Sequence, residues 1–422
     1  MKITIITTGS RGDVQPYIAL GAGLRKAGHT VCMPSAEVFR DLIIENGLQY
    51  IQTKSIDPQE FVQRPEMLKA IKDKNRLRSI CTMFREIRPL FEEILNETWG
   101  ACQGSDAVIT SLIPIGASDS AEKLGIPCIH TMLFPASPTS SFQSVVAPSL
   151  FNFGAYNKIT HKLTEQAVWQ PFRPILNKWR KEVLGLEPRN FWGPFRRIYQ
   201  GTSPVLCGYS SLVVPKPADW PDLINLTGYW FLDEPEDWQP SIELETFLNE
   251  GPPPVYIGFG SMADKEPERM TQIAIDALRL SGQRGILSSG WSGLGNVKLP
   301  DNVLKVDSIP HSWLFKKMAA IVHHGGAGTT AASLRSGIPS IITPFLVDQP
   351  FWGKSIYKLG AGPKPISYHK LSAENLAKLI STCINDKSMR IKAKALGKRI
   401  ESENGVENAV NIIEKYLVEL KK

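Results

Sequence analysis

The chain has 422 residues, of which 42% are hydrophobic and 21% are charged, and its formal net charge is +7. This length allows about two to three domains, and the composition is that of an ordinary globular protein. The modest charge fits an anionic ligand or an acidic membrane surface, and it excludes the strongly basic signature of nucleic-acid-binding proteins. The six cysteines show no metal-like spacing. With no apolar run of about 18 residues, we expect a cytoplasmic protein that does not span a membrane.

The first half alternates strand-like and helix-like segments. We expect strands at residues 3–7, 30–33, 48–52, 107–110, 127–132 and 205–214. We expect helices at residues 16–27, 35–45 and 118–124, and one long helix at about residues 158–184. This alternation predicts a parallel, doubly wound α/β sheet.

A second α/β unit begins near residue 254, after a connection rich in proline. Its expected strands are at residues 254–260, 285–288, 303–306, 320–323 and 339–343, with a helix at residues 267–280. The tail, residues 372–420, reads as successive helices. In such sheets ligands bind beyond the carboxyl ends of the strands, so the loops there are the candidate sites.

The loop after the first strand is residues 8–16, TGSRGDVQP. Its glycines allow a tight turn, and Asp13 lies at the mouth of the following helix. An aspartate in this position most simply caps the helix. It could also act as a general base that takes a proton from an attacking hydroxyl.

The loop after the strand at residues 320–323 begins with two histidines and continues as a glycine-rich turn, HHGGAGTT. A strand that ends in such a turn and opens a helix presents backbone N–H groups and a positive dipole end, which favours phosphate. A satisfied histidine pair is the structural alternative, and a zinc site has no third ligand nearby in sequence. Ser261, at the end of its own strand, offers another hydroxyl at the same level.

Two further segments have a binding and a structural interpretation. Asp348 and Gln349, after the strand at residues 339–343, have donors and acceptors suited to sugar hydroxyls, and they could equally form an Asx turn. Residues 134–197 are rich in aromatic side chains. This segment could be the wall of an apolar ligand site or the core around a long helix.

Taken together, these motifs resemble the GT-B fold, inverting, nucleotide-sugar-dependent glycosyltransferases. Within that superfamily the chain is similar to the sterol 3-beta-glucosyltransferases and the bacterial glycopeptide-antibiotic glycosyltransferases. The resemblance covers essentially the whole chain. The motifs that carry it are SRGDVQPYIALG at 10–21, VPKPADWP at 214–221, IPHSWLF at 309–315 and HHGGAGTT at 323–330.

The resemblance implies two Rossmann-like domains that face a cleft. Residues 1–215 would form the acceptor-binding domain, 216–240 a linker and 241–400 the nucleotide-sugar-binding domain, with a helix at 401–422 returning to the first domain. Asp13 would be the catalytic base. The residues expected to bind the donor are Ser10, Arg11, Ser261, Ser308, Ile309, His311, His324, Gly326, Ala327, Gly328, Thr329, Asp348 and Gln349.

The expected reaction is metal-independent transfer of a hexose from UDP-glucose to a hydroxyl of a sterol or another apolar polycyclic acceptor, with no bound cofactor. A dTDP-sugar stays open as the donor, because the plant uracil-stacking tryptophan is replaced by Ser308. A natural-product or glycolipid aglycone stays open as the acceptor. Val347 stands where glycine is usual before the Asp-Gln pair. The alternatives are an NDP-sugar epimerase of the same architecture and a peripheral lipid-binding protein. Transient contact with a membrane surface is compatible with each.

Overall fold

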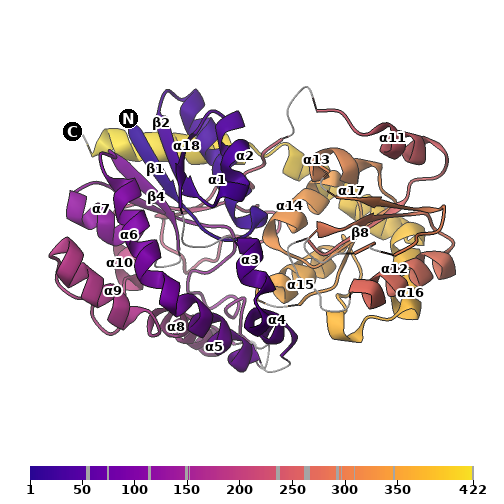
Figure 1. Ribbon diagram of the computed structural model, residues 1–422, viewed down its shortest axis with the longest axis horizontal. Coiled ribbons are helices and arrows are strands. Elements are labelled where there is room, and N and C mark those ends of the chain that lie inside the picture. The colour runs from indigo at the N-terminus through magenta and orange to yellow at the C-terminus, as the bar shows by residue number, and fades with distance from the viewer. Residues whose placement is uncertain are drawn as a thin grey trace. The chain divides into compact units, whose positions relative to one another are not determined.

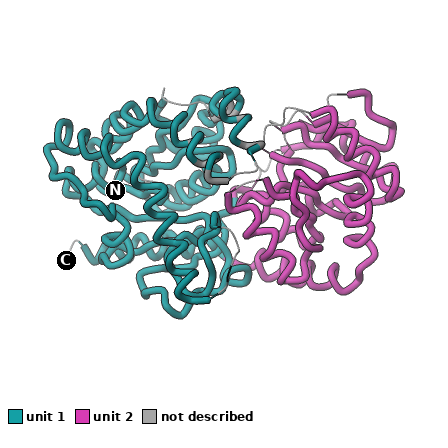
Figure 2. Tube along the Cα trace, turned by 90° about the horizontal axis from the view of Figure 1, so that it is seen from below, with its two compact units in different colours: residues 1–231, 404–422 teal, residues 232–403 magenta. Residues whose placement is uncertain are grey.

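The computed structural model describes residues 1–53, 58–73, 76–112, 116–147, 151, 153–233, 238–260, 267–290, 294–295, 297–307, 309–345 and 347–420. The chain folds into two compact units (Figure 2). Unit 1 comprises Met1–Phe231 and Asn404–Lys422, and unit 2 comprises Leu232–Glu403. None of the helices in the described part of the chain combines the length and the hydropathy needed to cross a bilayer.

Unit 1 is built on a seven-stranded sheet with the order β3-β2-β1-β4-β5-β6-β7. Figure 1 labels β2, β1 and β4 of this sheet. All neighbouring strands are parallel. The strands are β1 Lys2–Ile6, β2 Thr30–Ser35, β3 Gln49–Gln52, β4 Ala107–Ser111, β5 Cys128–Met132, β6 Val205–Cys207 and β7 Ile224–Leu226. The strand order reverses between β1 and β4, so the loops after these two strands flank the switch point of the sheet.

Helices surround this sheet. They are α1 Arg11–Lys26, α2 Arg40–Glu45, α3 Pro58–Gln63, α4 Pro65–Lys72, α5 Arg76–Ile87, α6 Phe91–Cys102, α7 Ala117–Leu124, α8 Gly154–Trp169, α9 Arg173–Trp179, α10 Phe195–Gln200 and α18 Gly405–Glu419. The last of these belongs to unit 1 although it ends the chain. It packs on α1 so closely that a Cβ added to Gly23 would lie 2.4 Å from Val406 Cγ1.

Unit 2 has a five-stranded parallel sheet with the order β10-β9-β8-β11-β12. The strands are β8 Val255–Gly258, β9 Gly285–Ser288, β10 Val303–Val306, β11 Ala320–His323 and β12 Ser340–Ile342. The helices are α11 Ile242–Asn249, α12 Pro267–Ser281, α13 His311–Leu314, α14 Ala327–Ser336, α15 Gln349–Leu359, α16 Ala373–Asn385 and α17 Lys387–Glu401. Here the order reverses between β8 and β11.

Side chains of the unit 2 strands alternate between two cores, because successive residues of a strand point to opposite faces. Val255 and Ile257 pack in the core formed with α12 and α16. Tyr256, between them, packs in the core formed with α11 and α13. Both faces of the sheet are therefore covered, as parallel sheets require.

The predicted doubly wound α/β class is confirmed for both sheets. Three predicted elements are wrong. The helix expected at residues 35–45 begins only at Arg40, because Ser35 ends β2 and Glu37–Phe39 form a 3-10 turn. The strand expected at residues 205–214 ends at Cys207, because the chain turns there and Val213 N and Val214 N donate to Ser210 O. The long helix expected at about 158–184 is divided into α8, α9 and a π-helical turn, Arg180–Leu184. Pro171 and Pro174 stand at the first break, where proline lacks the N–H that would continue a helix.

The elements that were not predicted are β7, the helices α3 to α6, and the helices α10, α11, α13 and α15. Strand β7 lies in the segment expected to be irregular, and its three residues are too few for an alternating pattern to show. Helices α3 to α6 fill much of residues 58–102. The sequences of α4 and α5 are amphipathic at the helical period, so this pattern was the available signal.

Candidate functional site

The switch point of unit 2 is occupied by the loop that follows β11. This strand is fully buried, and it ends in His323, whose register partner on β8 is Gly258. The next residue, His324, is buried as well, at 7% exposure. The imidazole of His324 therefore lies at the carboxyl edge of the sheet, between the loops after β8 and β11, where doubly wound sheets bind ligands.

Glycines on both sides allow the imidazole to lie against the backbone. A Cβ added to Gly326 would be 2.5 Å from His324 Nε2, and one added to Gly260 would be 2.9 Å from His324 Cε1. Gly325 has a φ of 90°, in the left-handed region that favours glycine. Its N–H donates to His323 Nδ1 at 3.1 Å, so one histidine shapes the turn and the other packs inside it.

The N-terminus of helix α14 follows directly. Gly326 is the N-cap residue and has no side chain to cap the helix. The first helical bond runs from Thr330 N to Gly326 O, at 2.9 Å. As at any helix start, the N–H groups of Ala327, Gly328 and Thr329 then have no acceptor inside the helix. These three residues are half-buried, so the positive end of the helix is accessible to an anion.

Burial keeps both histidines neutral near pH 7. It lowers the pKa of His324 to about 4, and it lowers the pKa of His323 well below the ordinary value. His324 Nδ1 is a buried atom that has no hydrogen-bond partner among the described residues. A buried polar atom without a partner is costly. A neutral imidazole in this position can donate one hydrogen bond to a ligand oxygen, and an anion there would raise the pKa of the ring.

The loop before α15 adjoins the histidine turn. A Cβ on Gly325 would lie 3.2 Å from Gln349 O. Gln349 Oε1 accepts a hydrogen bond from Phe345 N at 2.7 Å, and Asp348 Oδ2 accepts one from Trp352 Nε1 at 2.8 Å. Both predicted sugar-binding side chains thus also hold their own loop.

Val347 precedes this pair with a φ of 55°. A β-branched residue is strained in that region, where glycine is at ease. The glycine that the family pattern would place here is therefore replaced by a residue that the backbone does not favour.

His311 opens α13 on the same side of unit 2. Its ring stacks on Phe315 with centroids 4.3 Å apart, and Tyr256 OH lies 3.4 Å from His311 Nε2. It is near enough to His323 to contribute to the lowered pKa of that residue. Ile309 is half-buried just before it. Two other predicted donor residues, Ser261 and Ser308, lie outside the described residues.

Asp13 lies at the switch point of unit 1, in the first turn of α1. Its Oδ2 accepts hydrogen bonds from Ser10 N at 2.9 Å and from Ser10 Oγ at 3.0 Å. Gly9, with a φ of 127°, brings the backbone against the carboxylate, since an added Cβ would be 2.5 Å from Oδ2. Asp13 therefore caps the N-terminus of α1, as its position in the sequence predicted. Nearby, the exposed Arg11 donates from Nε to Gln15 Oε1 at 3.0 Å.

The environment of Asp13 makes its carboxylate more basic. The residue is exposed overall, while its carboxylate lies against the loop backbone. Desolvation there raises the pKa of Asp13, and the two hydrogen bonds from Ser10 act in the opposite direction without cancelling the rise. A raised pKa brings an aspartate closer to the range in which a general base is effective.

A cavity of about 50 Å³ opens beside the Asp13 loop in unit 1. It lies at the carboxyl ends of β1, β2 and β3, and α6 closes one side. Hydroxyl, carboxylate and apolar side chains line it, among them Thr7, Thr8, Ser35, Thr53, Glu97, Thr98, Val14 and Phe39. This volume has room for one or two water molecules or a small hydroxyl-bearing group.

Two family models match the chain, one in each half. Residues 3–143 match the glycosyltransferase family 28 N-terminal domain. Residues 291–416 match the C-terminal domain of the erythromycin biosynthesis protein CIII-like family. The fold agrees with the glycosyltransferase of kitacinnamycin at a TM-score of 0.72 and 18% identity, over 99% of both chains. The chain therefore has the fold of the GT-B glycosyltransferases.

Proteins similar to this chain include a sterol 3-beta-glucosyltransferase from Debaryomyces hansenii, which is 38% identical over 98% of the chain. The chain spans only 26% of the length of that relative. A solved glycosyltransferase, SsfS6 of Streptomyces sp. SF2575 complexed with thymidine diphosphate, aligns over 98% of this chain and 99% of that one. Its TM-score is 0.63, at 18% identity.

Sequence reasoning missed three residues of the unit 2 site. Gly260 and Gly325 accommodate the turn around His324, and His323 accepts its internal hydrogen bond. His323 and Gly325 stand inside the quoted motif at 323–330, so repeated glycines beside a histidine were the available signal, whereas Gly260 lies outside the quoted motifs. Their contacts with His324 depend on the pairing of β8 with β11, which is a tertiary feature.

Proposed function

We propose that this chain transfers a hexose from a nucleoside diphosphate sugar to a hydroxyl of a sterol-like, polycyclic acceptor. One observation carries the proposal. His324 is buried with Nδ1 unpartnered among the described residues, directly before the open N-terminus of α14. An imidazole N–H and three backbone N–H groups form a set of donors suited to a diphosphate.

The proposed donor is UDP-glucose. Support comes from the sterol 3-beta-glucosyltransferases to which the chain is similar. A dTDP-sugar is the second donor to test, because SsfS6 was crystallised with thymidine diphosphate. In either case the diphosphate would lie against His324 and the α14 amides. Asp348 and Gln349 would contact the sugar hydroxyls, and Ile309 and His311 would border the nucleoside.

The proposed reaction is a single displacement with inversion. The Asp13 carboxylate takes the proton of the acceptor hydroxyl, and the oxygen forms a bond to the anomeric carbon. The bond from that carbon to the diphosphate oxygen breaks, and the diphosphate leaves with the electron pair. The His324 N–H and the helix dipole stabilise this charge, each fixed donor being worth about 3 kcal/mol in a transition state. These groups would supply the stabilisation that a metal ion gives in other transferases.

A donor–acceptor matrix read by mass spectrometry tests the proposal. UDP-glucose, UDP-galactose and dTDP-glucose would each be incubated with a sterol, a macrolide and a flavonoid, with and without EDTA. We expect a sterol product heavier by one hexose from UDP-glucose, and unchanged turnover in EDTA. Transfer to none of the acceptors, or interconversion of the sugar when donor is incubated alone, would refute it. The second result would indicate an epimerase.

A further inference from the structure

Helix α8 in unit 1 places apolar side chains on its outer face. Ile159 and Leu163, one turn apart, are 56% and 64% exposed. Lys158 and Lys162 lie beside them and are exposed too. Its buried residues are Asn157, Thr160, His161 and Trp169. Helices on a protein surface usually have the reverse pattern, so the outer face of α8 is suited to contact with something apolar.

Exposed aromatic side chains lie at both ends of this helix. At its start, Phe151, Phe153 and Tyr156 form a cluster with ring centroids 5.4 to 6.1 Å apart. Near its end, Gln166 Nε2 donates to Trp192 O and Gln170 Nε2 donates to Phe191 O. These bonds hold the Phe191–Trp192 pair against α8. We define the α8 surface as Phe151, Phe153, Ile159, Leu163, Phe191 and Trp192, each at least 51% exposed.

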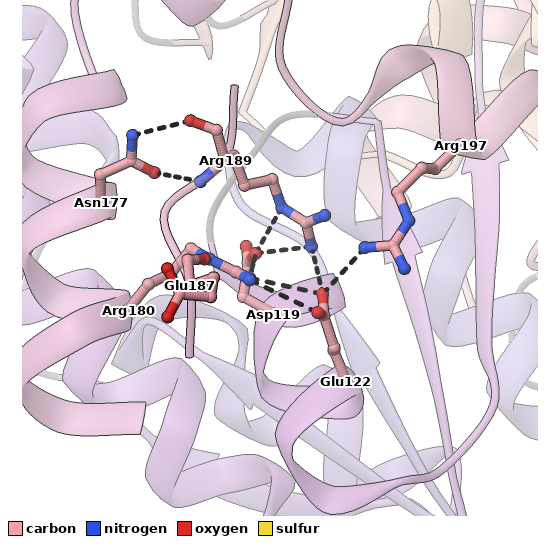
Figure 3. A network of polar contacts seen from close by, with 7 residues as sticks. All are labelled: Asp119, Glu122, Asn177, Arg180, Glu187, Arg189 and Arg197. Atoms are coloured by element: carbon pink, nitrogen blue, oxygen red, sulfur yellow. Dashed lines mark hydrogen bonds and ion pairs between the residues drawn. The ribbon is translucent and has the colours of Figure 1, made fainter. Parts of the chain in front are cut away.

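The same segment carries most of the net charge of the chain. Residues 151–200 contain nine lysines and arginines and three glutamates, a net of +6 against +7 for the whole chain. Arg180 and Arg189 are buried in ion pairs with Asp119 and Glu122 (Figure 3). The cations near the α8 surface remain outside that network. They are Lys162, Arg173, Arg196 and Lys158, the last of which is exposed with its Nζ 3.3 Å from Asp219 Oδ2. The Arg173 guanidinium lies 5.2 Å from the centre of the Phe191 ring.

We propose that the α8 surface docks on an anionic lipid bilayer. Phenylalanine and tryptophan side chains favour the boundary between headgroups and acyl chains, and lysines beside them are attracted to anionic lipids. Long lysine side chains can extend to the headgroups while isoleucine and leucine enter the apolar layer. A second copy of the chain fits less well, because a symmetric contact would place the same cations face to face. The proposal stands independently of the reaction proposed above.

Flotation with vesicles tests this surface. Purified protein would be mixed with vesicles of phosphatidylcholine alone or with added phosphatidylserine, in the absence of any sugar donor. We expect flotation with the anionic vesicles and a decrease with added salt. Ile159→Gln combined with Leu163→Gln should weaken binding about tenfold. The matched control is Ile391→Gln on α17 of unit 2, which is 68% exposed and should leave binding unchanged.

A charge exchange gives a second, independent comparison. Lys162→Glu should weaken binding to anionic vesicles several-fold, whereas Lys394→Glu on α17 should have a smaller effect. Thermal melting of each variant checks that it is folded. The proposal is overturned if the wild-type protein stays unbound, or if the Gln pair binds as the wild type does. It is also overturned if gel filtration shows a dimer that the Gln pair abolishes while vesicle binding persists.

Discussion

The His324 ring packs directly on Gly326, since a Cβ on Gly326 would lie 2.5 Å from His324 Nε2. The same glycine is the N-cap of α14. The position of the imidazole and the open end of the helix are therefore coupled through one residue without a side chain. This coupling places the N–H of the neutral His324 ring close to the free backbone N–H groups of α14, within unit 2.

Gly326→Ala should displace the imidazole and weaken donor binding. We expect the donor KM to rise about tenfold, with a smaller fall in kcat, because the lost contacts hold the diphosphate in the ground state too. Steady-state kinetics with varied UDP-glucose measure this. Gly100→Ala on α6 is the control, because an added Cβ there meets nothing within 4 Å. An unchanged KM for Gly326→Ala would contradict the packing argument.

Val347→Gly should stabilise unit 2. Removing a β-branched side chain from a φ of 55° relieves about 1–2 kcal/mol of strain, while the greater freedom of unfolded glycine offsets about half of it. We expect a rise of about 0.5–1 kcal/mol in the free energy of unfolding, measured in the urea transition that reports on unit 2. Val347→Ala keeps a Cβ and should gain less. A loss of stability in the glycine variant would be inconsistent with this account.

Asp13→Asn should keep the Ser10 hydrogen bonds and the fold while abolishing transfer, because an amide cannot take the proton. In the wild type, kcat/KM should fall as pH drops below the raised pKa of Asp13, since protonation removes the base. Ser10→Ala removes a hydrogen bond that lowers this pKa. The acid limb of its pH–rate profile should therefore lie at higher pH. If the acid limb of the Ser10→Ala profile lies at the same pH as that of the wild type, Asp13 is not the group whose titration the profile reports.

Burial of neutral His324 should make stability depend on pH. The unfolded ring binds a proton below about pH 6.5. The folded ring binds one only near its pKa of about 4. Stability is therefore lost as pH falls from about 6.5 toward 4, by up to about 3 kcal/mol for this residue. His324→Gln should show a shallower loss in urea melts across that interval. If the free energy of unfolding falls equally steeply with pH in both proteins, the His324 ring is hydrated in the folded state and the account is wrong.

Much of unit 2 could be predicted from sequence. The apolar run Ala320–His323, bounded by the glycine turn, is a strand with the predicted ends. Strands Gly285–Ser288 and Val303–Val306 also match. A short apolar run between glycine or proline residues is too short for a helix, so its sequence pattern predicts a buried strand with little ambiguity.

Other features could not be read from the sequence. The strand β7 has only three residues, too few for an alternating pattern to show. The dual use of Asp13 as a helix cap and a candidate base depends on where Ser10 and Gly9 lie in three dimensions. The contact of Gly325 with Gln349 joins loops from different strands, and no local pattern encodes it.

The central claim is that the His324 turn binds the diphosphate of the donor. Calorimetric titration of UDP and of uridine into the wild type and into His324→Ala tests it most directly. Binding of UDP should be at least about a hundredfold tighter than binding of uridine in the wild type, because the phosphates make the charged contacts. Most of that difference should disappear in His324→Ala. Equal binding of UDP and uridine by the wild type, or an unchanged difference in the variant, would contradict the account.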